Sequence, residues 1–399
     1  MTDLLWPGDH RAGLIFSDDA YLAAMLRVES AWLGALVESG IAPAAARADL
    51  SAAVSATDVE AVAVAAEATG NPVPGLLDIL RERTGGEPAR WLHRGLTSQD
   101  VIDTALMLCL RDVLDRIDSE MRSQIKRLAL LADTYRDSPM LARTLAQPAL
   151  PTTVGMKFGQ WLNGLLDAVD CVRALPELPV QAAGAAGTMA AATELSGSPV
   201  AAGDLSRQLA DTLGLAYSPP WHTTRSIISR AGDALVTCCD AWGHIANDVT
   251  AGSRPEIGEL AEGRGGGSST MPHKRNPVLS VLIRRAALVA PAQAAALHTA
   301  SAASVDERAD GGWHAEWATL RTLGRHAVVA AAQTTALLSG LTVDTDRAAA
   351  NLADAGDLLG EQRAMAELTG RAARPDYSGA AGHLIDAALG RAHHLVEET

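Results

Sequence analysis

Residues 98–137 carry apolar side chains three and four positions apart over about forty residues, which is the spacing of an amphipathic helix. Thr97 or Ser98 can cap this helix, and Asp100 falls in its first turn, where a negative charge is favourable. A Ser-Pro pair at 138–139 ends it. Such a length exceeds what a small compact domain uses, so the segment predicts a helical bundle.

The same apolar spacing recurs elsewhere, and no series of alternating strands interrupts it. One further stretch with this pattern is residues 19–57. Other long helices are expected at residues 151–175, 226–252, 277–303 and 313–338. The sequence therefore predicts an all-α fold with a central bundle of long helices.

Alanine-rich runs mark several of these helices, as in residues 289–303 and 326–338. Only 4% of all residues are aromatic, and small side chains let helix axes approach closely. Helices that are apolar on every face need neighbours on every face. Because one chain is too small to cover them all, we expect a homo-oligomer whose long central helices form a bundle shared between subunits.

Two interruptions of the helical pattern divide the chain. TGGEPARWLHRG ends at residue 95, and LLSGLTVD lies around residue 340. We therefore expect an N-terminal helical domain at 1–95, a central long-helix domain at 96–340 and a short C-terminal helical domain at 341–399.

The formal net charge of −14 limits the class of partner. No long block of Lys and Arg offsets it, so we expect neither nucleic acid nor an anionic membrane as a partner, and an anionic substrate would need a local cluster of positive charge. The chain starts without the pattern of a signal peptide, and its apolar stretches are broken by polar residues, so we expect a cytoplasmic protein. Its cysteines lie in apolar helical stretches without metal or redox spacing, and are expected to be reduced core residues: Cys109, Cys171, Cys238 and Cys239.

The segment GRGGGSSTMPHKRNPV, residues 263–278, combines glycines, hydroxyl groups and positive charge. Glycine tolerates backbone conformations that other residues avoid, so the amides of residues 265–267 can converge on an anion. Ser268 or Ser269, beside such amides and Lys274, can ionise and act as a base. On these residues alone, a flexible linker with incidental charge is an equal alternative.

Within this segment, GSSTMPHKRNP at 267–277 resembles the signature of the fumarase/aspartase superfamily, whose members add groups to, or eliminate them from, succinate-like carbon skeletons. The resemblance implies that Ser268 is the catalytic base. It places the substrate contacts of this loop at Ser269, Met271, Lys274 and Asn276. It also implies an all-α homotetramer with active sites shared among three subunits, and chemistry that needs no cofactor and no metal.

Two other stretches match the pattern of this superfamily. HRGLTSQD at 93–100 resembles its first signature, and ARTLAQPALPTT at 142–153 resembles its second. The start of a helix has N–H groups without a partner in the helix, and these can donate hydrogen bonds to a substrate carboxylate together with the hydroxyls of Thr97 and Ser98. The substrate contacts implied are His93, Thr97, Ser98, Gln99, Thr144 and Gln147. Taken alone, the first stretch is a good helix cap and the second an ordinary turn before a helix.

The departures from the pattern concern proton transfer to the leaving group. Fumarases and adenylosuccinate lyases have a histidine where this chain has Leu145; adenylosuccinate lyases have a second one at Pro148 and its glutamate partner at Val281. Hydroxide or an amine must be protonated as it leaves, whereas a carboxylate, with a conjugate-acid pKa of ~4, departs without that help. The resemblance therefore favours a weakly basic leaving group.

Several more stretches resemble the 3-carboxy-cis,cis-muconate cycloisomerase branch of the superfamily. They are residues 15–36, 95–108, 220–225, 313–317 and 391–397. This resemblance implies reversible closure of a small-molecule tricarboxylate to its lactone in aromatic catabolism (the β-ketoadipate pathway), with Arg225 among the substrate contacts. The alternative for Arg225 and His222 is surface charge at a helix start. Trp313 and Trp317, four apart on one helical face, are expected to pack.

Three other functions stay open. A lyase that releases nitrite from nitrosuccinate has an equally weak leaving group. An adenylosuccinate lyase-like enzyme is disfavoured, because ADGGWHAEW at 309–317 replaces the phosphate-binding segment expected after residues 306–308. A non-catalytic structural relative is disfavoured by the intact set of Ser268, Lys274 and Asn276.

Overall fold

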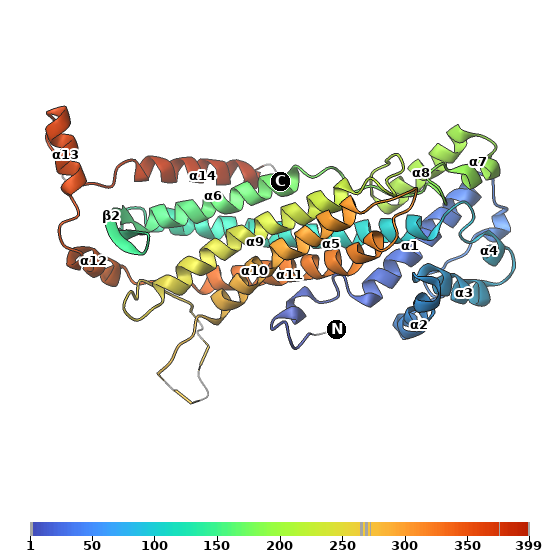
Figure 1. Cartoon of the computed structure of the whole chain (residues 1–399), viewed down its shortest axis with the longest axis horizontal. Coiled ribbons are helices and arrows are strands. Elements are labelled where there is room, and N and C mark those ends of the chain that lie inside the picture. Colours follow the sequence, from blue (N-terminus) through green and yellow to red (C-terminus); the bar gives the residue numbers. More distant parts are fainter. Residues whose placement is uncertain (1–2, 264–265, 268–269, 272, 375, 398–399) are drawn as a thin grey trace. The chain divides into compact units, whose positions relative to one another are not determined.

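A computed structural model describes residues 3–263, 266–267, 270–271, 273–374 and 376–397 of the chain (Figure 1). In chain order the elements are η1 (Asp9–Ala12), α1 (Asp18–Glu38), η2 (Ala44–Ala46), η3 (Ala56–Asp58), α2 (Val59–Thr69), α3 (Val73–Thr84), α4 (Gly86–Trp91), α5 (Ser98–Thr134), β1 (Pro139–Thr144), β2 (Gln147–Thr153), α6 (Val154–Arg173), α7 (Ala190–Ser196), α8 (Pro199–Leu213), α9 (Ser226–Gly252), β3 (Leu260–Ala261), α10 (Val278–Ala302), α11 (Gly312–Gly340), β4 (Thr342–Val343), α12 (Thr345–Asp354), α13 (Gly360–Thr369) and α14 (Ala381–Glu397). Helices dominate and the strands are short, which confirms the predicted all-α fold.

The long helices α5, α6, α9, α10 and α11 lie within a few residues of their predicted bounds. The prediction for 19–57 is wrong beyond residue 38, because α1 ends there. Ser39 caps the last turn by donating its hydroxyl to the Ala35 carbonyl at 2.7 Å, and Gly40 follows with a left-handed φ of 73°. The apolar residues beyond it continue into short 3-10 turns instead of a helix.

The hairpin of β1 and β2 was not predicted. Thr144 pairs with Gln147, so Leu145 and Ala146 alone form the turn, with φ of 49° and 62°. A two-residue turn with both φ values positive is the type that asparagine and glycine favour, and neither occurs here. Each left-handed non-glycine residue costs about 1–3 kcal/mol, which marks this turn as a strained point of the chain.

The chain divides into two compact units, and each is made of three separate segments. Unit 1 comprises residues 1–116, 175–233 and 292–325, and unit 2 comprises 117–174, 234–291 and 326–399. Four of the five boundaries fall inside α5, α9, α10 and α11, and the fifth, at 174/175, follows the end of α6. The predicted domains 1–95, 96–340 and 341–399 stay a prediction: residue 95 lies between α4 and α5, and residue 340 ends α11.

In unit 1, α1 packs against α8 and also holds the turn that precedes α5. The indole of Trp32, buried on α1, donates to the Arg94 carbonyl at 2.7 Å. Gly95 follows with φ of 93°, and a Cβ there would lie 3.3 Å from the Trp32 ring. This contact requires glycine at position 95, and it fixes where α5 begins.

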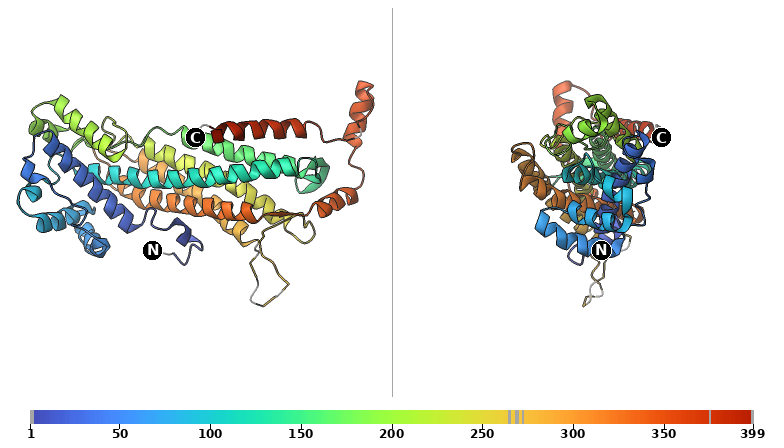
Figure 2. Two further views of the ribbon diagram at one scale, coloured as in Figure 1. Left: turned by 180° about the vertical axis from the view of Figure 1, so that it is seen from behind. Right: turned by 90° about the vertical axis from the view of Figure 1, so that its right-hand side faces the viewer.

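In unit 2, side-chain hydrogen bonds and close helix contacts build the core. Gln124 on α5 donates to the Ala331 carbonyl of α11 at 2.9 Å and accepts from the Trp242 indole of α9 at 2.8 Å. A Cβ on Gly243 of α9 would lie 2.6 Å from the Ala287 methyl group of α10. These helices approach closely because their contact residues are small. Along the outside, α14 runs beside α6 (Figures 1 and 2).

Three of the four cysteines are buried as predicted, whereas Cys171 is exposed on the surface of α6. Burial raises the pKa of the Cys109 and Cys238 thiols to about 12. The helices α1 and α10 are long and apolar enough to cross a membrane. The fold buries 61% of the most apolar 18-residue stretch of α1 and 28% of that of α10. This is weak evidence for a membrane segment, since a core helix of a soluble protein passes the same test.

Candidate active site

In unit 1, the start of α5 presents the residues of the first signature. The half-exposed Thr97 and Ser98 stand where the first N–H groups of α5 have no partner within the helix. The buried Asp100 accepts from the Thr97 amide at 2.9 Å, which closes the cap. Hydroxyls and amides of a helix start can together bind a carboxylate.

Asp100 also holds two other segments against the start of α5. Its carboxylate accepts from the amides of Ala183 and Gly184, each at 2.9 Å, and contacts the His222 Nε2 at 3.0 Å. The segment GAAGT at 184–188 therefore begins at this carboxylate. The position of the helix start thus depends on a buried acid, a loop and a histidine from three parts of the chain.

Arg308 is a functional candidate that the sequence analysis missed. Its Nη2 donates to the Thr97 hydroxyl and, at 3.4 Å, to the Ala185 carbonyl, while its buried Nε has no hydrogen-bond partner. In the sequence, residues 306–308 stand out only as the flank of a missing phosphate-binding segment. The structure places a guanidinium beside the first signature, where it adds positive charge for an anionic substrate.

His93 lies on the turn before α5, in the left-handed region with φ of 65°. Its Nδ1 lies 2.6 Å from the Glu29 Oε1 of α1, and Glu29 is fully buried. This contact fixes the orientation of the His93 ring on the turn before α5. Glu29 was not singled out from the sequence, because sixty-four residues separate it from His93.

The structure buries Arg225 and Gln99, two of the predicted substrate contacts, so neither side chain faces solvent in the described chain. The Arg225 guanidinium forms a bidentate pair with the Asp103 carboxylate and another with the Glu316 carboxylate, with shortest distances of 2.7 and 2.6 Å. Its remaining N–H donates to the Trp221 carbonyl at 3.4 Å. All five of its N–H donors are therefore used within the protein. Burial alone would lower the Arg225 pKa, but the two carboxylates outweigh it and hold it above its ordinary value.

The neighbours of this ion cluster are buried as well. Gln99 donates to Asp103 at 3.2 Å and to the His222 carbonyl at 2.9 Å. Trp313 donates to the other Asp103 oxygen at 3.0 Å and packs edge-to-face on Trp317, with ring centroids 4.7 Å apart. The packing role predicted for the two tryptophans is confirmed. The surface alternative for His222 and Arg225 is wrong, since both are buried.

In unit 2, Thr144 and Gln147 flank the exposed tip of the β1–β2 hairpin. Leu145, at that tip, is 99% exposed. Below the tip, the Arg143 guanidinium forms a bidentate pair with the buried Glu259, at 2.7 and 3.0 Å. The second signature is thus a rigidly anchored hairpin that presents its turn outward.

Segment 263–277 connects β3 to α10. It carries GSSTMPHKRNP at 267–277, which is the third signature of the superfamily in chain order. Ser268, predicted as the catalytic base, and its neighbour Ser269 lie outside the described residues. Gly266 and Asn276 exchange both backbone hydrogen bonds at 2.9 Å. The Gly266 amide is therefore not free to bind an oxyanion, contrary to the prediction for the amides of residues 265–267. A Cβ on Gly266 would lie 2.2 Å from a methyl of Val278, so this close approach is what requires glycine there.

The cationic side chains of this segment are exposed. The Lys274 amide donates to the Met271 carbonyl at 3.0 Å, and both side chains face outward. Within the described residues, Lys274 and Arg275 have no ion-pair partner. At the end of the segment, the buried Glu262 accepts from the Ser280 amide and hydroxyl, each at 2.7 Å, and so closes the start of α10.

The predicted site residues thus fall into two sets. Unit 1 holds the first signature with Arg308, and unit 2 holds the second and third signatures. Side-chain clusters that could hold a metal ion are not found in the described part of the chain.

Comparison with known proteins agrees with these signatures. The chain matches the family described as Lyase over residues 15–291. A nitrosuccinate lyase from Streptomyces davaonensis is 42% identical over 369 residues, which cover 88% of this chain and 77% of that protein. A 3-carboxy-cis,cis-muconate cycloisomerase from Bradyrhizobium diazoefficiens is 38% identical over 386 residues, which cover 94% and 83%.

Among solved structures, the 3-carboxy-cis,cis-muconate lactonizing enzyme from Pseudomonas putida matches with a TM-score of 0.84 at 29% identity, covering 96% of this chain and 97% of that one. The chain therefore belongs to the lyase family and is an enzyme of the fumarase/aspartase superfamily.

Proposed function

We propose that this enzyme interconverts 3-carboxy-cis,cis-muconate and its γ-lactone, 4-carboxymuconolactone, in aromatic catabolism. The observation that carries the proposal is Leu145, an apolar side chain at the exposed tip of the hairpin where fumarases present a histidine. A side chain without a titratable group is unable to protonate a leaving group. Opening the lactone expels a carboxylate, which is stable as an anion and leaves without a proton.

In the direction of opening, Ser268 removes the proton on the carbon next to a substrate carboxylate. The electron pair of that C–H bond forms the new alkene, and the lactone C–O bond breaks to release the ring oxygen as a carboxylate. In the direction of closure, that carboxylate adds to the alkene and Ser268 returns the proton to the neighbouring carbon. Lys274 and the loop amides other than that of Gly266 stabilise the ionised serine.

The charges of the described residues support a substrate with several carboxylates. Thr97, Ser98 and Arg308 form one group of donors in unit 1, and Lys274 and Asn276 form another in unit 2. In a chain with a net charge of −14, such local groups are what would attract and neutralise a tri-anion.

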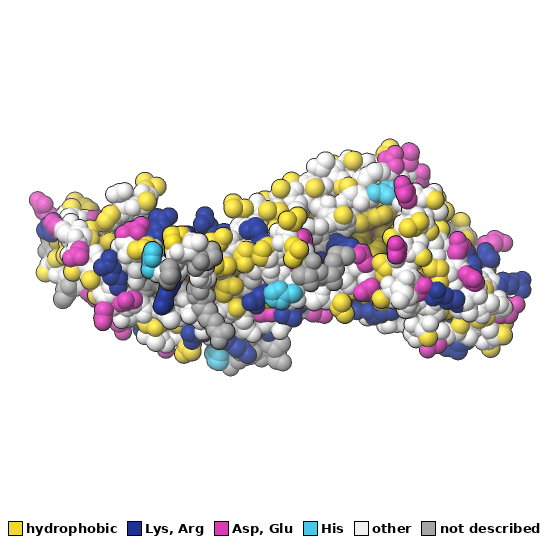
Figure 3. Space-filling view, turned by 90° about the horizontal axis from the view of Figure 1, so that it is seen from below, with side chains coloured by type: hydrophobic (Ala, Val, Ile, Leu, Met, Phe, Trp, Pro, Cys, Tyr) yellow, Lys and Arg dark blue, Asp and Glu magenta, His cyan; other side chains and the backbone are white. Residues whose placement is uncertain are grey.

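The proposal includes a cytoplasmic homotetramer whose active sites draw on three subunits. Apolar side chains on α10 support an assembly: Val281 is 52% and Leu288 78% exposed in the single chain. In Figure 3, hydrophobic side chains are exposed across the visible surface between charged ones. Size-exclusion chromatography with light scattering should give four times the chain mass of 41.5 kDa, and a stable monomer would refute the assembly.

Nitrosuccinate lyase is the second candidate, favoured by the 42% identity to the Streptomyces davaonensis protein. Nitrite, like a carboxylate, is a weak base, so Leu145 suits this reaction equally well. The substrate would carry two carboxylates and a nitro group instead of three carboxylates.

One experiment separates the candidates. Purified enzyme is incubated separately with carboxymuconate, nitrosuccinate, fumarate plus ammonia, and adenylosuccinate, and ultraviolet absorbance follows each conjugated system. Loss of the diene absorbance with carboxymuconate alone supports the proposal, and activity confined to nitrosuccinate supports the second candidate. Activity with adenylosuccinate would refute the argument from Leu145, Pro148 and Val281, and a chain inert toward all four would point to the non-catalytic alternative.

A further inference from the structure

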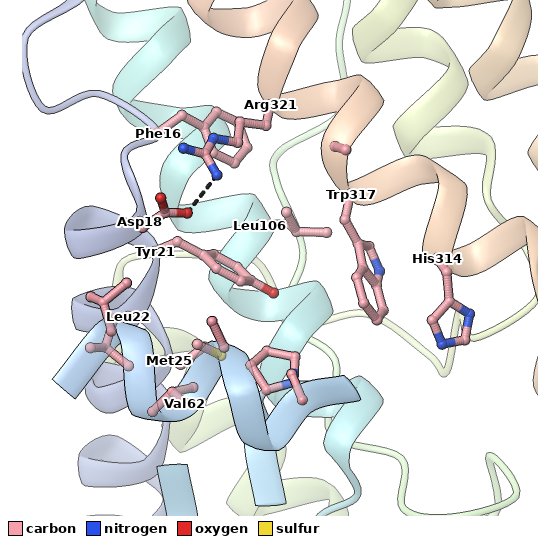
Figure 4. A pocket seen from close by; sticks show the side chains of 15 residues that line it. Phe16, Asp18, Tyr21, Leu22, Met25, Val62, Leu106, His314, Trp317 and Arg321 are labelled. Carbon is pink, nitrogen blue, oxygen red and sulfur yellow. Dashed lines mark hydrogen bonds and ion pairs between the residues drawn. The ribbon is translucent and has the colours of Figure 1, made fainter. Parts of the chain in front are cut away.

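Unit 1 contains a pocket of about 370 Å³ that the proposed reaction does not use. It lies among α1, α2, α5 and α11, and no residue of the three signatures lines it. The wall is mainly apolar and aromatic, with side chains that include Phe16, Leu22, Met25, Val62, Leu106 and Trp317 (Figure 4). A pocket of this size and character is typical of sites for small organic molecules.

Two polar groups in this wall lack hydrogen-bond partners. The Tyr21 hydroxyl and the Trp317 Nε1 are both buried, and neither bonds another group of the described chain. In Figure 4 the Tyr21 hydroxyl is directed toward the side of the pocket where Trp317 lies. An unpaired buried donor costs about 1–3 kcal/mol, and such groups are rare in folded proteins. A ligand that accepts from the Tyr21 hydroxyl would remove that cost for this donor.

The charges around the pocket favour a neutral ligand. Burial raises the pKa of the Tyr21 hydroxyl well above its ordinary value, and Cys109 and Asp103 add to the effect, so Tyr21 stays a neutral donor. The basic side chains among those lining the pocket are His314 and Arg321. Arg321 is already paired with Asp18 at 2.6 Å. An anionic ligand would therefore find no uncompensated cation among these lining residues.

We propose that this pocket binds a small neutral aromatic molecule with one carbonyl oxygen. The carbonyl accepts from the Tyr21 hydroxyl, and the ring packs against the apolar and aromatic wall that includes Phe16, Leu106 and Trp317. This binding does not depend on the reaction proposed above, and it can be tested without a substrate of that reaction.

The probe is acetophenone, and isothermal titration calorimetry compares it with ethylbenzene, which lacks the acceptor, and with benzoate, which is charged. We expect acetophenone to bind most tightly. Tyr21→Phe keeps the ring and removes one donor, so it should weaken acetophenone about 2- to 10-fold, as expected for one hydrogen bond, and leave ethylbenzene unchanged.

A filling variant with a matched control tests the place of binding. Ala66 of α2 lines the pocket, whereas Ala61 of the same helix is exposed and does not. Ala66→Phe should reduce binding of acetophenone at least 10-fold, and Ala61→Phe should leave it at the wild-type value, with equal melting temperatures for both variants. The proposal is overturned if wild-type protein does not bind acetophenone, if benzoate binds more tightly, if Tyr21→Phe weakens both neutral probes equally, or if Ala66→Phe binds like Ala61→Phe.

Discussion

Replacing Arg225 by methionine should destabilise unit 1 strongly. The guanidinium sits between the Asp103 and Glu316 carboxylates and over the Trp221 ring, with its carbon 4.7 Å from the ring centroid. All three charged side chains are almost completely buried. Methionine keeps an unbranched apolar stem that ends near the Nε position, so the substitution removes the guanidinium and leaves both carboxylates without their partner.

The expected loss follows from the two carboxylates that remain. Removing one partner of a buried ion pair costs about 3–5 kcal/mol, because it leaves an uncompensated charge in a medium of low polarity. The matched control is Arg321→Met on α11, whose pair with Asp18 is partly exposed to solvent at both ends. Such a pair contributes at most about 1 kcal/mol.

The loss should also depend on pH. Burial raises the pKa of the Glu316 carboxyl, and Arg225 opposes that effect in the wild-type protein. Without Arg225, folded Glu316 keeps a proton that the unfolded chain releases above its ordinary pKa of ~4.3. Because the folded state then binds more protons, the stability of the variant falls as the pH rises.

The assay is urea unfolding at pH 5 and pH 8, followed by tryptophan fluorescence, with both variants and the wild type at one protein concentration. We expect the deficit of Arg225→Met to be larger at pH 8 than at pH 5, and that of Arg321→Met to be small at both. A deficit below about 1 kcal/mol at pH 8, or one that shrinks as the pH rises, would refute the assignment of Arg225 as a buried structural cation.

Three other outcomes are expected. Ser268→Ala should reduce turnover by orders of magnitude with an unchanged melting temperature, and near wild-type activity would move the base elsewhere. Gly266→Ala should reduce the free energy of unfolding by about 1–3 kcal/mol, and with it the melting temperature, because the new methyl group collides with Val278. The control Gly267→Ala, whose methyl group meets nothing within 4 Å, should leave the stability unchanged. Equal effects of the two substitutions would contradict the contact with Val278. Iodoacetamide at pH 8 should label Cys171 alone in folded protein and all four cysteines in urea, as read by mass spectrometry; a second label in the folded state would disprove burial of the others.

The long helices could be predicted because their signal is local. Apolar side chains three and four positions apart and a Ser-Pro stop specify α5 without knowledge of the rest of the chain. The β1–β2 hairpin has no such signal. Its turn is Leu145-Ala146, two residues that do not favour positive φ, so nothing in the local sequence distinguishes it from an ordinary loop.

The candidate site could be predicted only in part, because its buried contacts are distant in sequence. The signatures identified half-exposed residues such as Thr97, but its partner Arg308 is 211 residues away. Arg225 bonds an acid 122 residues before it and another 91 residues after it. A guanidinium has the same appearance in a sequence whether it binds a substrate or a pair of buried carboxylates.

The three-segment composition of unit 1 has a consequence for synthesis on the ribosome. Its first segment ends at residue 116 and its last at residue 325, so 325 − 116 = 209 residues must be added before the unit has all its parts. At translation rates of about 5–20 residues per second, that takes roughly 10–40 seconds. During this interval the mainly apolar stretch from Val101 to Leu110, which is buried in the folded chain, stays exposed to solvent because the segments that cover it have not all been synthesised. The nascent chain is therefore a natural client for chaperones that shield apolar helices until the last segment emerges.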